Sequence, residues 1–367
     1  MATKSKVVES SFRLGCGRYI QENGAIHRIG EELVRLGAKT PFILGGSTAL
    51  SLTGEAIEAS LSRHGIEMNV YVYHGFCNAD HCEEIVQSLA FMDTDCVVGV
   101  GGGNVMDAAK LCAAMAGVSV INIPTSAATC AAYTPLSVVY NDRGQTVGTL
   151  HHLREVDAVL ADMEILCAQP PRLLAAGIYD SLAKLIELRQ RMDGKDADEL
   201  EIGLLASFEM SKFLYDRLLA DADGVLDDVT HRRNTKRLYD TVYLILALTG
   251  VVSGLARGSN QTAIAHKIYE TTRTLFPEQT RGALHGELVA MGLLVQLTYN
   301  QEENQAERFR AQMLMRKMPV TLNELGLPSD EQTLDAYYEK IVASSAMNGT
   351  NDAEKECLRQ SLKQLIL

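Results

Sequence analysis

The sequence predicts an α/β fold in its first half, built on a parallel sheet, followed by an all-helical second half. Three features indicate this division. Short apolar runs alternate with helical patterns from Lys6 to Asp162, as they do in βαβ units. Glycine turns follow two of these runs. After Pro170 and Pro171, apolar residues recur with helical periodicity almost throughout. We therefore expect an α/β domain at 1–162 and a helical domain at 163–367.

Composition limits the classes of function. A chain of 367 residues is longer than one ordinary hydrophobic core requires, so two domains are expected. The formal net charge of -12 argues against nucleic acids and anionic membranes as partners, because both favour basic surfaces. The eight cysteines show no paired spacing, which indicates a reducing compartment. The first residues form no apolar leader, and no uncharged run is long enough to span a membrane. We expect a cytoplasmic protein that acts on a small molecule.

Four strands are predicted in the first half, each a short apolar run that ends at turn residues. They cover 41–44, 68–73, 96–100 and 119–123. Because a helical pattern separates successive runs, right-handed crossovers should join them into a parallel sheet. Ligands of such sheets bind at the carboxyl ends of the strands, where both glycine turns lie.

The glycine turn after Val100 is the most informative of these. Three adjacent glycines, Gly101 to Gly103, precede a helical pattern. Glycine lets the backbone approach a bulky anion, and a helix N-terminus directs free N–H groups and a positive dipole at it. The stretch therefore indicates a phosphate cradle, although a glycine turn can also simply join a strand to a helix.

The second half is predicted to be a stack of helices. Examples cover 173–189, 199–219, 236–255 and 284–299. The acidic stretch 221–228 is predicted to be a solvated loop. A cleft between the two halves is the expected ligand site, since such clefts commonly bind small molecules.

Two histidine groups are weak candidates for a metal site. The set His74, Cys77, His81 and Cys82 lacks the spacing of a structural zinc site and has no matching second pair. The intervening residues from Asn78 instead predict a capped connection between a strand and a helix. His151 and His152 are adjacent, so their side chains point apart, and we expect them at the surface.

A third set, Asp180, His266 and His285, suits a metal better. One carboxylate and two neutral imidazoles can hold zinc or iron(II) and leave positions open for a substrate. Their spacing alone does not establish a site, because histidines in helices commonly pack or cap.

Four motifs together resemble a known family. The glycines with Asp107 to Lys110 resemble the GGGxxxDxAK element of the metal-dependent (iron-type) alcohol dehydrogenase superfamily. The segment 123–140 resembles the PTxASTDAPxSxxSVIY stretch of glycerol dehydrogenases, and 177–180 and 285–287 match as well. The four motifs stand in the family's order over essentially the whole chain. The resemblance implies a dehydroquinate synthase-like, glycerol dehydrogenase-like fold.

The resemblance also implies a metal-dependent oxidoreductase that uses NAD or NADP. Asp180, His266 and His285 would bind the metal and form the catalytic centre. The long-chain iron alcohol dehydrogenases carry a further histidine one helical turn after the aspartate. Here that residue is Lys184, which favours the glycerol dehydrogenase-like branch and zinc over iron. Relatives form homo-oligomers, so we expect one here.

The same resemblance assigns a dinucleotide seat to the first domain, which is then Rossmann-like. The residues implied to hold the cofactor pyrophosphate, or to lie beside it, are Gly102, Gly103, Asn104, Val105 and Asp107. Those implied to line the rest of the cofactor groove are Thr125, Ala128, Thr134, Leu136 and Tyr140.

Several positions depart from the family pattern. Asn104 stands where the family has a lysine, and Ala128 stands where it has a serine. Tyr269 stands where many members carry a second histidine. Members that prefer NAD place an aspartate at Gly46, where it binds the ribose 2′-hydroxyl and repels a 2′-phosphate. Glycine leaves room there, so we expect NADP to be favoured over NAD.

Cys130 is the departure that bears on the substrate. Glycerol dehydrogenases place a carboxylate at this position of the substrate pocket. A neutral thiol cannot accept hydrogen bonds from polyol hydroxyls as a carboxylate does, and it does not repel an anion. The surrounding run resembles the hydroxycarboxylate dehydrogenases of this branch. We therefore rank a 2-hydroxy acid/2-oxo acid pair above glycerol or another vicinal diol, with glycerol dehydrogenase activity as the alternative.

Two interpretations belong to other classes. The superfamily contains lyases of the dehydroquinate synthase kind, which use NAD transiently to make cyclic products. Their additional phosphate-binding lysines and arginines are not found here as a set. A non-catalytic binding protein would account for the altered Asn104 and Cys130, but the intact Asp180, His266 and His285 set argues against it.

Overall fold

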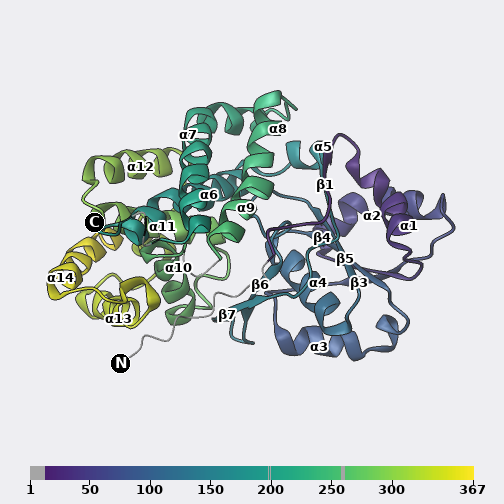
Figure 1. Ribbon diagram of the computed structural model, residues 1–367, viewed down its shortest axis with the longest axis horizontal. Coiled ribbons are helices and arrows are strands. Elements are labelled where there is room, and N and C mark those ends of the chain that lie inside the picture. The colour runs from purple at the N-terminus through teal and green to yellow at the C-terminus, as the bar shows by residue number, and fades with distance from the viewer. Residues whose placement is uncertain (1–12, 197, 199, 258–260) are drawn as a thin grey trace.

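The two predicted halves lie beside each other in the computed structural model, with the sheet and α1 to α4 at one end and the long helices at the other (Figure 1). The structure describes residues 13–196, 198, 200–257 and 261–367. The predicted start of the α/β pattern at Lys6, and Glu199 in a predicted helix, lie outside these residues. The predicted fold class, an α/β half followed by a largely helical half, is confirmed.

The sheet has six parallel strands in the order β1-β8-β5-β4-β2-β3. Their bounds are β1 Tyr19–Glu22, β2 Pro41–Gly45, β3 Asn69–Val72, β4 Cys96–Gly101, β5 Ser119–Pro124 and β8 Ala158–Asp162. The four predicted strands are present within a residue or two. The sequence analysis did not predict β1 or β8, although β8 is as long and as fully buried as β2. They join the sheet at its far side, where β8 pairs with both β1 and β5.

Alternate residues of each strand fill two separate cores. Phe42 and Val97 point to the side of α3 (Ala79–Gln87) and α4 (Gly103–Ala116). Ile43 and Val98 point to the side of α1 (Ile29–Leu36) and α2 (Ser47–Ser62). Strands that are buried on both faces are apolar along their whole length rather than alternating, which is why the sequence signal was strong.

The strand order reverses between β2 and β4. The chain runs from β2 outward to β3 and then returns to the opposite side of β2 as β4. At this point Gly45 lies opposite Val100, and the N–H of Gly46 donates to the carbonyl of Val100 at 3.3 Å. In open α/β sheets, ligands bind at such reversals. Both glycine turns recognised in the sequence therefore meet at one place.

A hairpin outside the main sheet was not predicted. β6 (Leu136–Tyr140) and β7 (Thr146–His151) pair in antiparallel fashion with an irregularity at Val139 and Tyr140. β7 is largely exposed, so its sequence carries little of the apolar pattern on which strand prediction depends.

The helical half is organised around α6 (Pro171–Met192), in which 15 consecutive residues, Leu174 to Leu188, are buried. The surrounding helices include α7 (Ile202–Thr230), α8 (Lys236–Tyr243), α9 (Thr249–Leu255), α10 (Ile264–Leu275) and α11 (His285–Tyr299). Outside them lie α12 (Glu303–Met315), α13 (Glu331–Val342) and α14 (Asp352–Ser361), and α5 (Met163–Cys167) joins the two halves. One large hydrophobic core unites these helices.

The acidic stretch 221–228 is a helix and not the predicted loop. It forms the C-terminal part of α7. Asp228 is 1% exposed and accepts from Arg233, Thr235 and Arg237. These partners follow Asp228 within nine residues and fold back over it. The carboxylate of Asp228 is therefore the centre of a local network. The polar residues around it in the sequence gave no indication of this.

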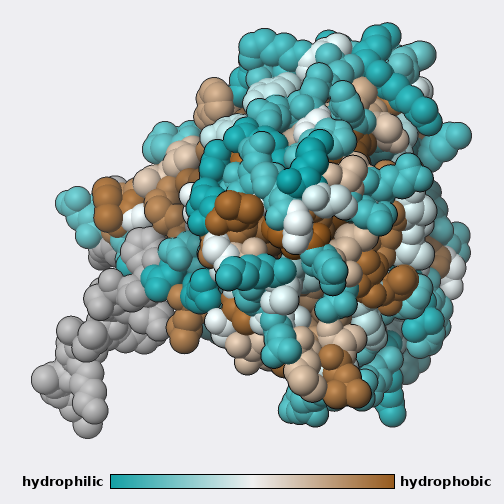
Figure 2. All heavy atoms as spheres, turned by 90° about the vertical axis from the view of Figure 1, so that its right-hand side faces the viewer, coloured by the Kyte–Doolittle hydropathy of each residue, from teal (hydrophilic) through white to brown (hydrophobic). Residues whose placement is uncertain are grey.

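The run Lys236–Leu255, from α8 to α9, is long and apolar enough to cross a membrane by length and composition alone. Its most apolar window has a mean hydropathy of 1.6, and 56% of that window is buried inside the protein. Such a run is also typical of a core helix, and here it packs on α7. At the sheet end of the molecule, hydrophilic and apolar side chains are interspersed over the surface (Figure 2).

Replacing Gly286 with Ala is expected to destabilise the helical half. A Cβ at Gly286 would lie 2.0 Å from the carbonyl oxygen of Ala176 in α6, so one of the two helices must move. Such overpacking costs about 1–3 kcal/mol, and thermal unfolding should show a melting temperature lower by several degrees. Gly282→Ala is the control, because no atom lies within 4 Å of its added Cβ. Equal melting temperatures for the two variants would contradict the proposed contact.

Candidate metal and cofactor site

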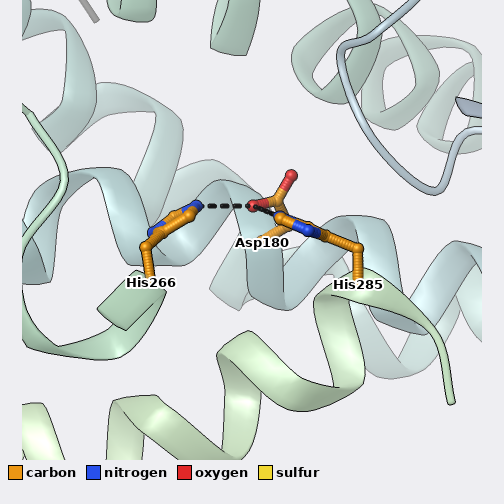
Figure 3. Close-up of side chains that lie close together, drawn as sticks. All are labelled: Asp180, His266 and His285. Carbon is orange, nitrogen blue, oxygen red and sulfur yellow. Dashed lines mark ion pairs between the residues drawn. The ribbon is translucent and has the colours of Figure 1, made fainter. Parts of the chain in front are cut away.

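Asp180, His266 and His285 come together at one point of the helical half (Figure 3). The Nε2 atoms of both histidines lie 3.4 Å from the same oxygen, Oδ1 of Asp180. The three ligand atoms all lie within 4.8 Å of one another. The long sequence separations are closed because α6, α10 and α11 pack on one another.

Each ligand is positioned by a helix. Asp180 lies on the buried α6, His266 in the first turn of α10, and His285 at the first residue of α11. The ring of Tyr269 packs edge-on against His285, with ring centroids 4.2 Å apart. At the start of α11, Glu287 accepts from the N–H of Leu284 at 2.8 Å and pairs with Arg172 at 2.6 Å.

Glu187 contacts both the backbone and the imidazole of His266. The sequence analysis did not identify this residue. One of its oxygens accepts from the backbone N–H groups of Ala263 and His266, at 2.7 and 2.9 Å. The other is 2.6 Å from Nδ1 of His266. A proton on Nδ1 leaves Nε2 free to bind a metal. The available signal was spacing, because Glu187 lies seven residues after Asp180 and thus on the same face of α6.

The electrostatics of the cluster favour charged carboxylates. Burial would raise the pKa of Asp180, but Lys184 and the two histidines outweigh it and hold the pKa well below its usual range. Burial likewise opposes ionisation of Glu187, and His266 nevertheless lowers its pKa. Burial would lower the pKa of His266, yet Glu187 raises it to about 9. A metal ion must displace a proton from this imidazole, so its binding should strengthen as the pH rises.

The donor set fits a divalent metal. Oδ1 of Asp180 is buried and accepts no hydrogen bond from the residues that the structure describes. A buried polar atom without a partner is costly, and here it faces two imidazole nitrogens. One carboxylate and two imidazoles, with a supporting carboxylate behind one of them, are typical of a catalytic site with open positions. In the described part of the chain, no other group of three such ligands lies close enough together.

The two glycine turns fit a dinucleotide phosphate. Gly46 precedes α2 and Gly102 precedes α4, and neither helix N-terminus is capped by a side chain. Their free N–H groups lie at the strand reversal. Gly101 has a φ of 152°, which favours glycine. A Cβ at Gly103 would lie 3.1 Å from Oγ1 of Thr129, so a side chain there would crowd the following loop. Asn104 and Val105 continue the first turn of α4.

The loop after β5 connects this seat to the helical half. Thr125 donates its N–H to the carbonyl of Gly101 at 2.9 Å. A Cβ at Gly177 of α6 would lie 2.0 Å from the carbonyl oxygen of Ala127 and 3.1 Å from Cα of Ala128. The loop thus contacts the glycine turn of Gly101 at one end and α6, the helix of Asp180, at the other.

Asp107 lies in α4, buried in the interior. Its Oδ1 is 2.9 Å from Nζ of Lys110, and its Oδ2 accepts from the N–H of Val138 at 3.2 Å. Lys110 donates to the carbonyls of Ala131, Thr134 and Leu136. This pair fixes the loop and β6 onto α4. The pair therefore supports the proposed cofactor groove indirectly, by holding the loop in place. Both carboxylate oxygens of Asp107 face groups of the protein itself.

Tyr140 lies at the junction of the two halves. Its ring stacks on Phe76 with centroids 4.7 Å apart, and its hydroxyl contacts that of Tyr269. Tyr269 in turn packs on His285. Tyr140 therefore links the hairpin to the metal-binding helices. Thr134 is buried and its hydroxyl donates to the carbonyl of Cys130 at 3.4 Å, while Leu136 is half-buried at the start of β6.

Cys130 lies near the metal ligands. Burial raises the pKa of its thiol to about 11, with Lys184 lowering it and Asp180 raising it. A thiol with this pKa is neutral at physiological pH. The resemblance places Cys130 in the substrate pocket, and this stays a prediction.

The remaining histidine candidates serve other roles. Asn78 caps α3 by accepting from the N–H of His81 at 3.0 Å, as predicted, and Cys77 and Cys82 are buried in the core. His151 is exposed, as predicted. His152 is not a surface residue: it is half-buried, its Nε2 is 2.8 Å from Oγ of Ser137, and burial lowers its pKa to about 4. Successive residues at the end of β7 point to opposite faces, so His152 points inward where His151 points outward.

The chain is similar to known proteins both in sequence and in fold. Residues 16–163 match the family described as iron-containing alcohol dehydrogenase. The chain is 31% identical to a glycerol dehydrogenase of Thermotoga maritima over 87% of this chain and 86% of that protein. It is 35% identical to hydroxycarboxylate dehydrogenase A of Escherichia coli over 72% of each chain. A probable glycerol dehydrogenase of Sinorhizobium meliloti has the same fold, with a TM-score of 0.82, 24% identity and 97% coverage of each chain.

Glu187→Gln is expected to weaken divalent-metal binding. Glutamine can still accept from the two backbone N–H groups, but its amide would donate to Nδ1 of His266 and move the imidazole proton to Nε2. Loss of such a support typically lowers metal affinity by about 10- to 100-fold, which zinc titration against a competing chelator measures. Glu302→Gln is the control, because Glu302 pairs with Arg189 of α6 at 2.6 Å away from the cluster. Unchanged zinc affinity in Glu187→Gln would contradict the assigned role.

Proposed function

We propose that this chain, which belongs to the iron-containing alcohol dehydrogenase family, interconverts a small 2-oxo acid and its 2-hydroxy acid. Its class is that of the metal-dependent NAD(P) oxidoreductases of diols or hydroxy acids. The assignment to this class of oxidoreductase rests on the match to the two relatives, which spans most of the chain. The observation that carries the proposal is Cys130, a neutral thiol that lies within electrostatic range of Asp180 and Lys184. We propose Asp180, His266 and His285 as metal ligands and catalytic centre, and the two glycine turns as the cofactor seat.

The geometry supports a reaction at the junction of the two halves. When bound, a divalent ion supplies Lewis-acid polarisation of the substrate oxygen, and nicotinamide supplies or accepts the hydride. Glu187 holds the imidazole proton of His266 on Nδ1, so that Nε2 faces Asp180. Tyr269 fixes the ring plane of His285. The Thr125–Tyr140 segment joins the proposed seat to the helical half through its contacts with α4 and α6.

A second candidate is a vicinal diol such as glycerol. The glycerol dehydrogenase of Thermotoga maritima is a relative over nearly the whole chain, which favours it. Cys130 distinguishes the candidates, because a carboxylate there would accept hydrogen bonds from hydroxyls and would repel an anion. The neutral thiol favours the acid.

The test of this proposal is a substrate panel of 2-oxo acids, glycerol and vicinal diols, with both cofactors and added zinc. The unmodified enzyme should turn over 2-oxo acids with the highest kcat/KM. Cys130→Asp should shift the ratio toward diols by about tenfold or more, because a new carboxylate near a bound anion repels it. Cys130→Ser, which keeps a neutral side chain, is the control. No shift in Cys130→Asp would show that residue 130 does not select the substrate.

Cofactor preference is the second proposal, with NADP favoured over NAD. Gly46 ends the β2 turn, and a Cβ there would meet only Cγ2 of Val105 at 3.9 Å. The space beside it is open, and Ser47 and Thr48 supply exposed hydroxyls at the start of α2. A 2′-phosphate fits such a place, whereas an aspartate would exclude it.

Gly46→Asp should reverse this preference. The structure leaves room for the side chain, so folding should not be affected. NADPH use should fall by about tenfold or more, since like charges about 4 Å apart near a surface repel by up to about 4 kcal/mol. The kcat/KM values for NADPH and NADH measure the effect, with Gly46→Ala as the uncharged control. An NADH preference in the unmodified enzyme would refute the assignment.

We also propose zinc as the metal, a homo-oligomeric state and a cytoplasmic location. Zinc is supported by Lys184 in place of a further histidine. All eight cysteines are free, which suits a reducing compartment.

A further inference from the structure

Lys184 is a buried cation at the focus of the metal site, and no step described above uses it. It lies one helical turn after Asp180 on α6 and is 6% exposed. Its Nζ is 3.8 Å from Oδ1 of Asp180, the same oxygen that both imidazoles approach. The ammonium is therefore beside any small molecule that occupies this point.

The ammonium of Lys184 has unused donors. Within the described parts of the chain, its one polar contact is the long ion pair to Asp180. Lys110 offers a direct comparison, because it is also a buried lysine, 2% exposed. Lys110 donates to three carbonyl oxygens and pairs with Asp107 at 2.9 Å. Buried donors without acceptors are costly, so a lysine that only supported the fold would be expected to resemble Lys110.

The balance of buried charge indicates what Lys184 binds. Asp180 and Glu187 contribute two negative charges, and Lys184 contributes one positive charge. The Asp107 and Lys110 pair cancels, and the thiol of Cys130 is neutral. A divalent cation on the three ligands would bring the sum to +1. One further negative charge then completes the site. The carboxylate of an acid carries this charge before it binds, whereas a neutral polyol must first lose a proton.

We propose that Lys184 binds the carboxylate of the substrate and thereby selects hydroxy and oxo acids over neutral alcohols. The ammonium donates to a carboxylate oxygen while the oxygen to be reduced or oxidised lies at the metal ligands. This inference rests on the proposed 2-oxo acid activity and assigns its specificity to a residue of α6. Cys130 permits the anion by carrying no charge, and Lys184 attracts it.

The test compares an anionic and a neutral substrate of similar size, 2-oxobutanoate and 1-hydroxy-2-butanone. In Lys184→Met, the ratio of their kcat/KM values should fall by about 10- to 100-fold, the usual loss when a hydrogen bond to a charged group is removed. Lys184→Arg should retain part of the ratio. Lys236→Met is the matched control, because Lys236 forms an exposed i,i+4 pair with Asp240 on α8 and should leave the ratio unchanged.

Binding without turnover gives an independent measurement. Calorimetric titration of the zinc-loaded protein with oxamate, an unreactive monoanion, should show affinity lowered by a similar factor in Lys184→Met at equal zinc content. The unmodified protein should bind oxamate more tightly than the neutral amide glycolamide. Equal binding of the two would overturn the proposal whether or not any variant folds.

The remaining outcomes separate this inference from the proposed function. An unchanged ratio and unchanged oxamate affinity in a folded, zinc-loaded Lys184→Met would overturn the role of Lys184 while 2-oxo acid turnover stood. If that variant does not fold, Lys184→Gln is measured in its place and judged by the same ratio. Lysine-dependent oxamate binding without turnover of any 2-oxo acid would refute the function and leave the anion site intact.

Discussion

The close approach of α6 to two backbone segments is the constraint on which the rest of this structure depends. On one side Gly177 lies against the carbonyl of Ala127, and on the other Gly286 lies against the carbonyl of Ala176. Neither position has room for a Cβ. The first contact brings the loop that follows β5 to the helical half, and the second sets the start of α11. Asp180 and His285 face each other because both contacts are made.

Buried charge is the second organising feature. α6 presents Asp180, Lys184 and Glu187 on one face, and all three are buried. Such groups are tolerated only when they are paired, and here each faces a partner from another helix or from its own. Glu187 combines two tasks, since it caps the first turn of α10 and orients the imidazole of His266. A single carboxylate therefore couples the folding of α10 to the geometry of the proposed metal site.

The proposed cofactor seat and the proposed metal site lie at the two ends of one loop. The strand reversal at β2 and β4 brings the two glycine turns together, and the loop after β5 runs from there to α6. The internal Asp107 and Lys110 pair holds this loop to α4. The three proposed metal ligands and the residues Gly46, Cys130 and Lys184, which are proposed to set the cofactor and substrate preferences, thus share a single framework.

The sequence by itself determined the fold class, the four central strands, the long helices and the three proposed metal ligands, because buried parallel strands, amphipathic helices and ordered motifs all leave local patterns. It did not reveal β1 or β8, nor the hairpin whose second strand β7 is exposed, nor the helical state of 221–228. Only the tertiary structure showed that Asp228 and His152 turn inward, that Glu187 supports His266, and that Lys184 keeps unused donors beside Asp180. These features depend on which side chains are buried when distant segments pack together, and the cost of burying a charge is decided by that packing rather than by the local sequence.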